Sequence, residues 1–438
     1  MLALFLLASY LLLSPEPWPV SLHIAKRPPD FKAWHDAELA LPQNNASLPP
    51  PQGRQGRYVR FSNHYTHEGW GNVMQELLMN AHLAYVANAT FVMYNYTWDP
   101  YARGDASLFL FTKVVPARTP MSALVAGPVA GGSYPEEAWR PPAVTPEFFE
   151  KICPEPTLFD VSRLKNESEI HPWTSASDIM DVFSAHIQTS RDNCMEFKAD
   201  TGRIFDWDLF ANVERMRSLW PTFKHSPILT EWAWSPLVSS ILRDNYARIH
   251  PLAGDAESNS ILPGLLAMHI RRGDFVRHCT RLADRNQTYQ AFNAFEGMLD
   301  QFVPPRGWGG ERNQAYYDAY RERCYPEQEA IVAKVSQVRM EALEQGRPLN
   351  RIYVLTNGDA AWTKDLEREL RGEGEWESVT SSRDLEVDWE QHFVAQAADM
   401  VIAARAEIFI GNAWSSLTSN VNMLRVVRGV PIETSRFW

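Results

Sequence analysis

The segment 264–275, Gly-Leu-Leu-Ala-Met-His-Ile-Arg-Arg-Gly-Asp-Phe, constrains the fold of this chain more than any other stretch. An apolar run leads into His269, Arg271 and Arg272, and the chain is then expected to turn at 273–274. This pattern predicts a buried strand that delivers two guanidiniums and an imidazole to one point. Ligands of open α/β sheets collect at the carboxyl ends of strands. Because arginine presents a planar, always charged fork of donors, we expect a phosphate-bearing ligand there.

Strand and helix patterns alternate in both halves of the chain, which predicts an α/β protein with two doubly wound lobes that face a cleft. In the first half, a strand, a glycine-containing loop, a helix and a second strand form a βαβ unit with parallel pairing, over 58–61, 72–86 and 90–94. The second half repeats the alternation at 265–270, 326–344, 351–356, 360–370, 389–404, 407–410 and 415–427. Between 100 and 250 the periodicity is weak, and it indicates only helices near 146–152, 176–188, 208–219 and 234–248.

Charge and cysteine content narrow the class of protein. The 53 acidic residues outnumber the 42 basic ones, so the net charge of -11 argues against a nucleic-acid partner. Four cysteines allow three pairings, of which we favour the sequential ones, Cys153–Cys194 and Cys279–Cys324. Five glycosylation sequons also favour a secretory protein, at Asn45, Asn88, Asn95, Asn166 and Asn286.

Two further loops accompany the arginine-bearing one. In the first, Gly69 and Gly71 allow close backbone approach and positive φ, and Asn72 is expected to start a helix whose free N–H groups attract an anion. Taken alone, this short pattern is better explained by a structural turn. The other loop follows a strand at 407–410, where three hydroxyl side chains either cap the next helix or bind a phosphate, namely Ser415, Ser416 and Thr418. The two roles are compatible.

Together these loops resemble those of GDP-fucose-dependent fucosyltransferases of the protein O-fucosyltransferase kind, whose members share the GT-B fold. The matching patterns are Glu-Gly-Trp-Gly-Asn at 68–72, His-Ile-Arg-Arg-Gly-Asp-Phe at 269–275, and Asp399 with the segment 409–418. They bracket residues 57–430. The resemblance implies inverting, metal-independent transfer of L-fucose from GDP-fucose to a hydroxyl of a protein Ser/Thr or a glycan. GDP-fucose is then a donor substrate, and no cofactor is expected.

The resemblance also implies a role for each candidate residue. Arg271 contacts the β-phosphate of GDP and steadies the leaving group, while Asp399 recognises guanine with Asn357 close by. Glu68 occupies the place of the catalytic base in one branch of the family, whereas other branches carry no acid there. The remaining candidates line the pocket for the nucleotide sugar, with the hydroxyls of the late loop holding the diphosphate: Gly69, Gly71, Asn72, His269, Arg272, Asp274, Ser415, Ser416 and Thr418.

The sequence patterns predict how the chain is divided. Residues 1–20 form a signal peptide or signal anchor, because their apolar run is short for a membrane span of about 20 residues. Residues 21–56 form a Pro-rich stem without regular structure, so folding is expected to begin near Arg57. Residues 57–250 form an N-terminal Rossmann-like lobe with an acceptor-side insert, and 251–438 a C-terminal Rossmann-like lobe that binds the GDP-sugar. We expect this protein in the lumen of the Golgi or ER, either cleaved or held by a single N-terminal anchor.

The expected residues suit this chemistry, and two other functions are compatible with parts of the sequence. A fixed arginine and helix N-termini stabilise a departing diphosphate, and a carboxylate on the opposite face accepts the acceptor proton. One alternative is a secreted or anchored carbohydrate- or nucleotide-sugar-binding protein with an inactive GT-B fold. The other is a metal-dependent GT-A transferase in which Asp206 and Asp208 of an Asp-Trp-Asp triplet hold Mn²⁺. The complete arginine and serine loops favour the active, metal-independent enzyme.

Overall fold

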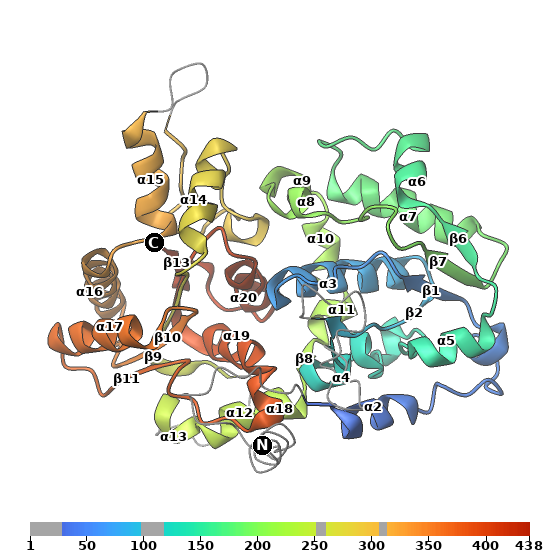
Figure 1. Cartoon of the computed structure of the whole chain (residues 1–438), viewed down its shortest axis with the longest axis horizontal. Helices are drawn as coiled ribbons and strands as arrows, with labels where there is room; N and C mark the ends of the chain where they lie inside the picture. The colour runs from blue at the N-terminus through green and yellow to red at the C-terminus, as the bar shows by residue number, and fades with distance from the viewer. Residues whose placement is uncertain (1–28, 98–117, 251–259, 306–312) are drawn as a thin grey trace, which may run out of the picture.

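The chain folds into two α/β lobes that lie side by side (Figure 1). The structure, a computed structural model, describes residues 29–97, 118–250, 260–305 and 313–438. The signal or anchor segment expected at 1–20 lies outside these residues, and so does the start of the lobe expected from residue 251. Within the described ranges, no helix is both long and apolar enough to cross a membrane.

The first lobe is built on a four-stranded parallel sheet in the order β2-β1-β7-β6. Helix α3 (Trp70–Val86) connects its first two strands, so the βαβ unit expected at this place is confirmed. Apolar residues surround most of α3, and it is buried over nearly its whole length. The strands are β1 (Tyr58–Phe61), β2 (Thr90–Phe91), β6 (Thr157–Phe159) and β7 (Cys194–Phe197).

The second strand is shorter than the expected 90–94. After Phe91 the chain leaves the sheet, and Val92 pairs instead with Val144 as an isolated parallel bridge. Short antiparallel pairs and helices complete this lobe: β3 (Tyr96–Thr97) with β4 (Arg118–Thr119), β5 (Val125–Ala126) with β8 (Ala233–Trp234), α4 (Met121–Leu124), α5 (Pro146–Ile152), α6 (Val161–Glu167), α7 (Ala176–Thr189), α10 (Trp220–Phe223) and α11 (Pro227–Thr230).

Two helices expected between residues 208 and 248 are each divided in two. The helix expected at 208–219 is α8 (Trp207–Phe210) and α9 (Val213–Arg217). The Asn212 side chain accepts a hydrogen bond from the Arg215 amide, which starts a new helix instead of continuing the old one. The helix expected at 234–248 is likewise α12 (Pro236–Asp244) and α13 (Tyr246–Ile249).

The second lobe is built on a five-stranded parallel sheet in the order β11-β10-β9-β12-β13. The chain starts at the central strand, builds outward to one edge, and then crosses to the other side, so the sheet is doubly wound as expected. The strands are β9 (Leu262–Ile270), β10 (Arg351–Thr356), β11 (Ser378–Ser381), β12 (Ala406–Gly411) and β13 (Ser435–Phe437).

Alternation along β9 divides its side chains between two layers of helices. Leu266, Met268 and Ile270 join one apolar cluster with α16 (Gln328–Glu344) and α17 (Ala360–Gly372). The intervening residues of β9 pack toward the larger cluster that contains α19 (Ala395–Arg405) and α20 (Ser416–Val427). Because side chains in a strand alternate between faces, His269 lies on the side of α20.

Three features of the helices correct the expectations. The helix expected at 389–404 is interrupted, giving α18 (Trp389–His392) before α19. Helices α14 (Phe275–Asp284) and α15 (Gln314–Cys324) were not expected. The Pro-rich segment is not wholly irregular, because α2 (Lys32–Leu39) lies within it (Figure 1). Phe31 is fully buried and the Trp34 indole donates to Glu390, so these contacts offset the cost of ordering a Pro-rich chain.

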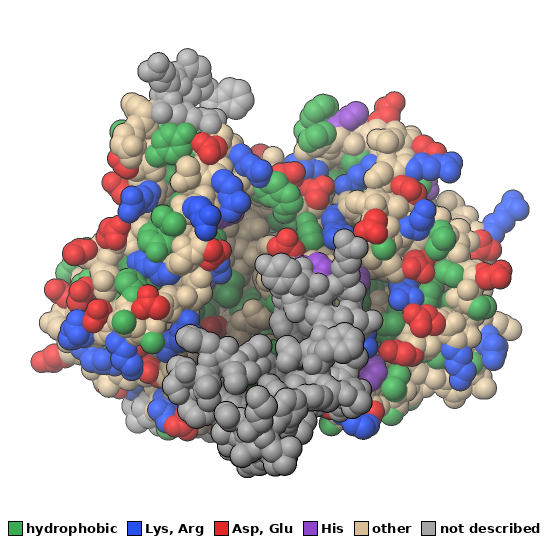
Figure 2. Space-filling view, viewed as in Figure 1, with side chains coloured by type: hydrophobic (Ala, Val, Ile, Leu, Met, Phe, Trp, Pro, Cys, Tyr) green, Lys and Arg blue, Asp and Glu red, His purple; other side chains and the backbone are tan. Residues whose placement is uncertain are grey.

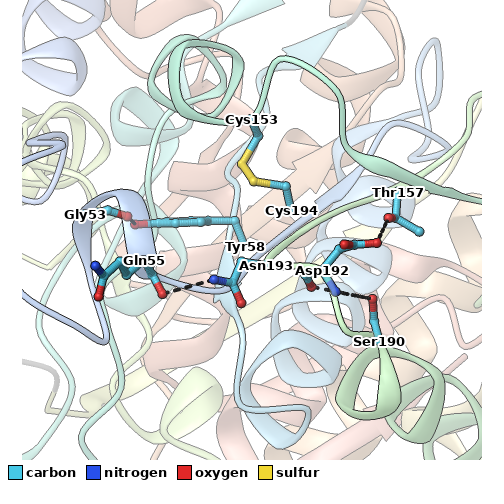
Figure 3. The surroundings of a disulfide bond; sticks show 9 residues. All are labelled: Gly53, Gln55, Tyr58, Cys153, Thr157, Ser190, Asp192, Asn193 and Cys194. Carbon is cyan, nitrogen blue, oxygen red and sulfur yellow. Dashed lines mark hydrogen bonds between the residues drawn. A yellow bond between two sulfur atoms is a disulfide. The ribbon is translucent and has the colours of Figure 1, made fainter.

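Both favoured disulfides are confirmed. Cys153–Cys194 joins the end of α5 to the start of β7, as Figure 3 shows beside the Tyr58 hydroxyl that donates to the Gly53 carbonyl. Cys279–Cys324 joins α14 to the end of α15. The two bridges span 41 and 45 positions. Loops of that length correspond to about 4 kcal/mol each in the chain-entropy model.

Candidate active site

The two lobes meet where the glycine loop touches the start of α20. A Cβ on Gly71 would lie 2.5 Å from the Ser416 hydroxyl oxygen and 2.9 Å from the Leu417 nitrogen, so only glycine allows this approach. The Asn420 amide also donates to the Gly71 carbonyl at 2.8 Å. The loop after β1 and the loop after β12 therefore face each other across the junction between the lobes.

The arginine-bearing loop reaches the same place. Strand β9 lies between β10 and β12, at the point where the doubly wound sheet changes direction. Ligands of such sheets bind at this switch point, outside the carboxyl ends of the strands. His269 Nδ1 lies 2.9 Å from the Thr418 hydroxyl, which links the end of β9 to the first turn of α20. The structure thus brings together the three loops that the sequence analysis singled out.

Arg271 is the candidate with the most unused hydrogen-bonding capacity. Its Nη2 donates to Asp274 at a long 3.4 Å, its Nε is buried without a partner, and its guanidinium lies 4.8 Å from the Phe275 ring centre. Burial lowers its pKa, and Asp274 acts in the opposite direction. Arginine stays charged after such a shift. A partly exposed guanidinium with spare donors suits an anionic ligand.

Arg272 does not join its neighbour, which corrects the expectation that both guanidiniums reach one point. Its side chain is buried, lies 4.4 Å from the Tyr325 ring centre and 4.2 Å from the Trp362 ring centre, and donates to the Pro326 carbonyl. Consecutive residues at the end of an extended segment point to opposite sides. These contacts support a structural role for Arg272.

His269 is a neutral member of the site. Burial, followed by the nearby Arg271 charge, lowers its pKa to about 3. Its carbonyl accepts a hydrogen bond from the Trp438 indole at 2.9 Å, which joins the end of β9 to the C-terminal residue of the chain. The imidazole therefore contributes shape and hydrogen bonding rather than positive charge at neutral pH.

The start of α20 has free donors. Ser415 occupies the N-cap position, but its side chain makes no capping hydrogen bond, so of the two roles considered for it capping is not seen. Among the described residues, the backbone N–H groups of Ser416, Leu417 and Thr418 also have no hydrogen-bond partner. Free N–H groups at a helix N-terminus, with the helix dipole behind them, form a site for an anion. Ser416 adds a hydroxyl at the same end.

The candidate guanine site lies near the carboxyl ends of β10 and β11. Asp399 accepts hydrogen bonds from the Tyr353 hydroxyl at 2.7 Å and the Ser382 hydroxyl at 3.1 Å. Ser382 also accepts from the Thr356 amide, directly before Asn357. Burial raises the pKa of Asp399 to about 6, although both hydroxyls and Arg383 oppose the shift. The carboxylate is thus mainly ionised at neutral pH.

Asn357 and Asp274 complete the end of this sheet. The Asn357 side chain accepts from the Arg272 amide at 2.8 Å and donates to the Arg272 carbonyl at 3.1 Å, so it joins the loop after β9 to the loop after β10. It also lies 3.4 Å from the Asp274 carboxylate, which is exposed. Both residues shape the loop that carries Arg271.

The glycine loop holds Glu68 at the surface of the opposite lobe. The Asn72 amide donates to the Glu68 carboxylate at 3.1 Å. Helix α3 begins at Trp70, slightly before the expected Asn72. Gly69 has φ −64 and Gly71 lies within the helix, so neither glycine adopts the positive φ that its lack of a side chain allows. The residue with positive φ is His67, at 72°.

The Asp-Trp-Asp triplet has another role. The Asp206 carboxylate caps α8 by accepting from the Leu209 amide at 3.0 Å and pairs with Lys165 at 3.2 Å. Within the described part of the chain, no cluster of three or more His, Cys, Asp or Glu side chains forms a metal site. Burial, then the Asp206 charge, raises the pKa of Asp208. Helix capping explains this triplet without a metal.

Sequence reasoning missed the partners that hold these residues. Tyr353 and Ser382 orient Asp399, and Glu76 lies buried beneath the glycine loop. A polar Glu76 within an apolar helix was the available signal for a buried functional group. The space-filling view shows a hollow between the lobes, with Lys and Arg side chains gathered over α14 on one rim (Figure 2).

Comparisons with known proteins agree with this geometry. The family model for GDP-fucose protein O-fucosyltransferase matches residues 160–428, more than half of the chain. No curated protein matches in sequence. The crystal structure of POFUT1 in complex with GDP is similar, with a TM-score of 0.52 and 15% identity over 87% of this chain and 98% of that chain.

Two other solved structures are less similar. NodZ alpha-1,6-fucosyltransferase soaked with GDP-fucose has a TM-score of 0.40 and 11% identity over 84% of this chain and 92% of that chain. A variant of Arabidopsis thaliana FUT1 in complex with GDP has a TM-score of 0.40 and 12% identity, with 95% and 80% covered. With its two doubly wound lobes in the GT-B arrangement and a family match over 160–428, this chain belongs to the GDP-fucose protein O-fucosyltransferase family.

Proposed function

We propose that this protein transfers L-fucose from GDP-fucose to an acceptor hydroxyl, with inversion at the sugar carbon and without a metal ion. One observation carries the proposal: the under-partnered guanidinium of Arg271 lies at the switch point, two residues after His269, whose ring contacts Thr418 in the first turn of α20. Family membership supports GDP-fucose as the donor. Two disulfides and the family also favour the secretory pathway. Residence in the Golgi or ER lumen and an N-terminal anchor are parts of the proposal.

The donor side stabilises the leaving group. Cleavage of the bond between fucose and the β-phosphate builds negative charge on GDP and positive charge on the sugar. Arg271 and the first turn of α20, with Ser415, Ser416 and Thr418, are aimed at the negative charge. Preorganised donors of this kind lower the barrier because they need no reorientation during the reaction. The neutral His269 holds Thr418 in place without adding a competing charge.

Guanine recognition is assigned to Asp399, with Asn357 at the neighbouring strand end. An ionised carboxylate accepts from the two N–H groups on the edge of guanine, whereas uracil and cytosine do not present that pair. The hydrogen bonds from Tyr353 and Ser382 fix the orientation of the carboxylate. This arrangement accounts for a preference for GDP over UDP or CDP.

The acceptor is expected to enter from the first lobe. Glu68 is the proposed base, because its exposed carboxylate lies on the loop opposite the donor site and is held by Asn72. It removes the proton from the acceptor hydroxyl as that oxygen attacks the fucose carbon from the face opposite GDP. A protein Ser/Thr or a glycan hydroxyl satisfies this chemistry equally.

The test is a hydrolysis and transfer screen with GDP-fucose and with other GDP-, UDP- and CMP-sugars, each with and without EDTA. We expect fucose release from GDP-fucose to be fastest and unaffected by EDTA. Arg271→Ala should lower kcat by about 100-fold or more, as when an oxyanion donor is removed. Arg277→Ala, at an exposed position of α14 nearby, removes the same charge and should have little effect. Preference for a UDP-sugar refutes the donor assignment, and GDP binding without any sugar release indicates an inactive binding protein.

A further inference from the structure

The loop 62–69 between β1 and α3 carries Glu68 and leads into the glycine turn, so its conformation decides where both lie. Several backbone and side-chain contacts hold it, of which three follow. The His67 amide donates to the Thr97 carbonyl at 3.3 Å, His64 Nδ1 lies 2.7 Å from the Phe61 carbonyl, and the Asn63 amide donates to the Gly202 carbonyl at 2.9 Å.

The same loop contains local strain. His67 has φ 72, a left-handed conformation that non-glycine residues seldom adopt. Such a conformation persists only where surrounding contacts determine it, and it is common at functional sites. The contacts around this loop are therefore required to keep Glu68, the next residue, in one position.

Glu76 supplies a buried contact to this loop. It lies on α3, two turns after the glycine turn, and is only 1% exposed. Its carboxylate accepts a hydrogen bond from the Tyr65 backbone amide. A carboxyl group in this setting is costly to bury, so an apolar residue would be expected here if the helix only had to pack. Neither donor binding nor proton transfer uses Glu76 directly.

Arg203 holds the loop from the other side. Its guanidinium donates to the Asn63 carbonyl, lies 4.9 Å from the centre of the Tyr65 ring and reaches Glu76 at 3.9 Å. Glu76 and Arg203, from distant parts of the sequence, thus contact the two ends of the Asn63–Tyr65 turn. Because they also face each other, loss of either one loosens the same segment.

We propose that Glu76 and Arg203 are positioning residues, which hold the loop 62–69 so that Glu68 and the glycine turn stand in reacting geometry. The inference rests on the proposed function for its kinetic consequence, but the holding of the loop is measurable without turnover. A displacement of about 1 Å at a reacting group costs on the order of 100-fold in rate. Glu76 therefore affects kcat through Glu68 and leaves donor binding, which belongs to the second lobe, largely intact.

The experiment compares three variants of the full chain. Glu76→Ala removes the acceptor for the Tyr65 amide, whereas Glu76→Gln keeps an oxygen in the same place. Glu38→Ala is the matched control, because Glu38 is also buried and accepts a backbone amide, from Ser122 at 2.9 Å, but lies on α2 away from the site. Hydrogen exchange of the amides in 62–69, the Kd for GDP, and kcat and KM for transfer are measured for each.

We expect Glu76→Ala to accelerate exchange in 62–69 and to lower kcat by about 10- to 100-fold, with the Kd for GDP within about threefold of wild type. Glu76→Gln should restore both exchange and kcat, and Glu38→Ala should change neither. Unchanged exchange in Glu76→Ala overturns the proposal, as does faster exchange with unchanged kcat. A parallel loss of GDP binding also overturns it, because that result indicates general unfolding.

Fucose release and transfer by the wild-type protein test the proposed function, independently of the hydrogen exchange in 62–69. If wild-type protein releases and transfers no fucose, the proposed function fails. Exchange in 62–69 then decides the holding role alone: faster exchange in Glu76→Ala supports it and unchanged exchange overturns it.

Discussion

Gly71 offers the sharpest test of the contact between the lobes, because Gly69 in the same turn is its internal control. In Gly71→Ala the new Cβ would lie 2.9 Å from the Leu417 nitrogen, about 0.5 Å closer than the 3.4 Å of an ordinary contact. The Ser416 hydroxyl, at 2.5 Å, can rotate away, but a backbone nitrogen cannot. The first turn of α20 therefore has to move away from α3. Overpacking of this kind costs about 1–3 kcal/mol.

Gly69→Ala meets no such obstacle. No atom lies within 4 Å of the position of its Cβ, and its backbone, at φ −64 and ψ 150, suits alanine. Alanine is a poorer N-cap than glycine. It also reduces the conformational entropy of the unfolded chain, which stabilises the folded protein by about 0.4–1 kcal/mol. These two effects nearly cancel, so the variant should behave like wild type.

Thermal unfolding and calorimetric titration with GDP separate the two variants. Gly71→Ala should lower the unfolding midpoint and weaken GDP binding by about tenfold, since loss of one hydrogen bond to a charged group costs about 1.5 kcal/mol or more. Gly69→Ala should change neither. Two results would contradict this prediction: Gly71→Ala binds GDP like wild type, or Gly69→Ala is the variant with weaker GDP binding. In either case the close contact between α3 and α20 does not shape the donor site.

Three further predictions concern single charged groups. Arg271→Lys keeps the charge but loses the planar fork, so kcat/KM for GDP-fucose should fall about 100-fold; Arg272→Lys should mainly lower the unfolding midpoint, and the reverse pattern would contradict the roles assigned from their contacts. GDP binding, measured by titration between pH 5 and 8, should weaken as the pH falls through about 6, because Asp399 is then protonated; Asp399→Asn should abolish this dependence, and a persistent dependence in that variant would assign it to another group. Burial raises the pKa of Glu76 from 4.5 to about 8. The free energy of unfolding therefore falls as the pH rises between those values, because the folded protein holds a proton that the unfolded chain releases. Urea unfolding measures this as a free energy of unfolding. Relative to wild type, that of Glu76→Gln should rise over this pH range by on the order of a few kcal/mol. A difference that stays constant with pH would mean that the Glu76 carboxyl titrates normally.

Local sequence patterns were sufficient for the elements that carry the site. The apolar run before His269 predicted β9, because a strand in a parallel sheet with helices on both faces needs apolar side chains on both sides. Helices α3 and α20 followed from their periodicity and from the strands before them. The expected disulfides are also present, each closing a loop within one half of the chain. The strand and the helices depend on residues close together in the sequence, and each disulfide joins positions within one half of the chain.

Other features depended on contacts that a local pattern does not contain. The helix expected at 389–404 divides into α18 and α19, and the Pro-rich segment contains α2 because the Phe31 ring finds a buried site in the folded chain. Arg271 and Arg272 look equivalent in sequence. The first keeps spare donors at the junction, whereas the second is enclosed by Tyr325 and Trp362, which come from other parts of the second lobe.

The sequence by itself determined two parallel α/β lobes and the three loops in which polar side chains follow apolar strands. Only the tertiary structure decided that Gly71 touches Ser416, that His269 meets Thr418, and that Glu76 supports the loop of Glu68. The physical reason is that hydrophobic periodicity fixes which face of an element is buried, but not which distant element covers it. That choice is made when the two sheets pack and the carboxyl ends of their strands are brought to one junction.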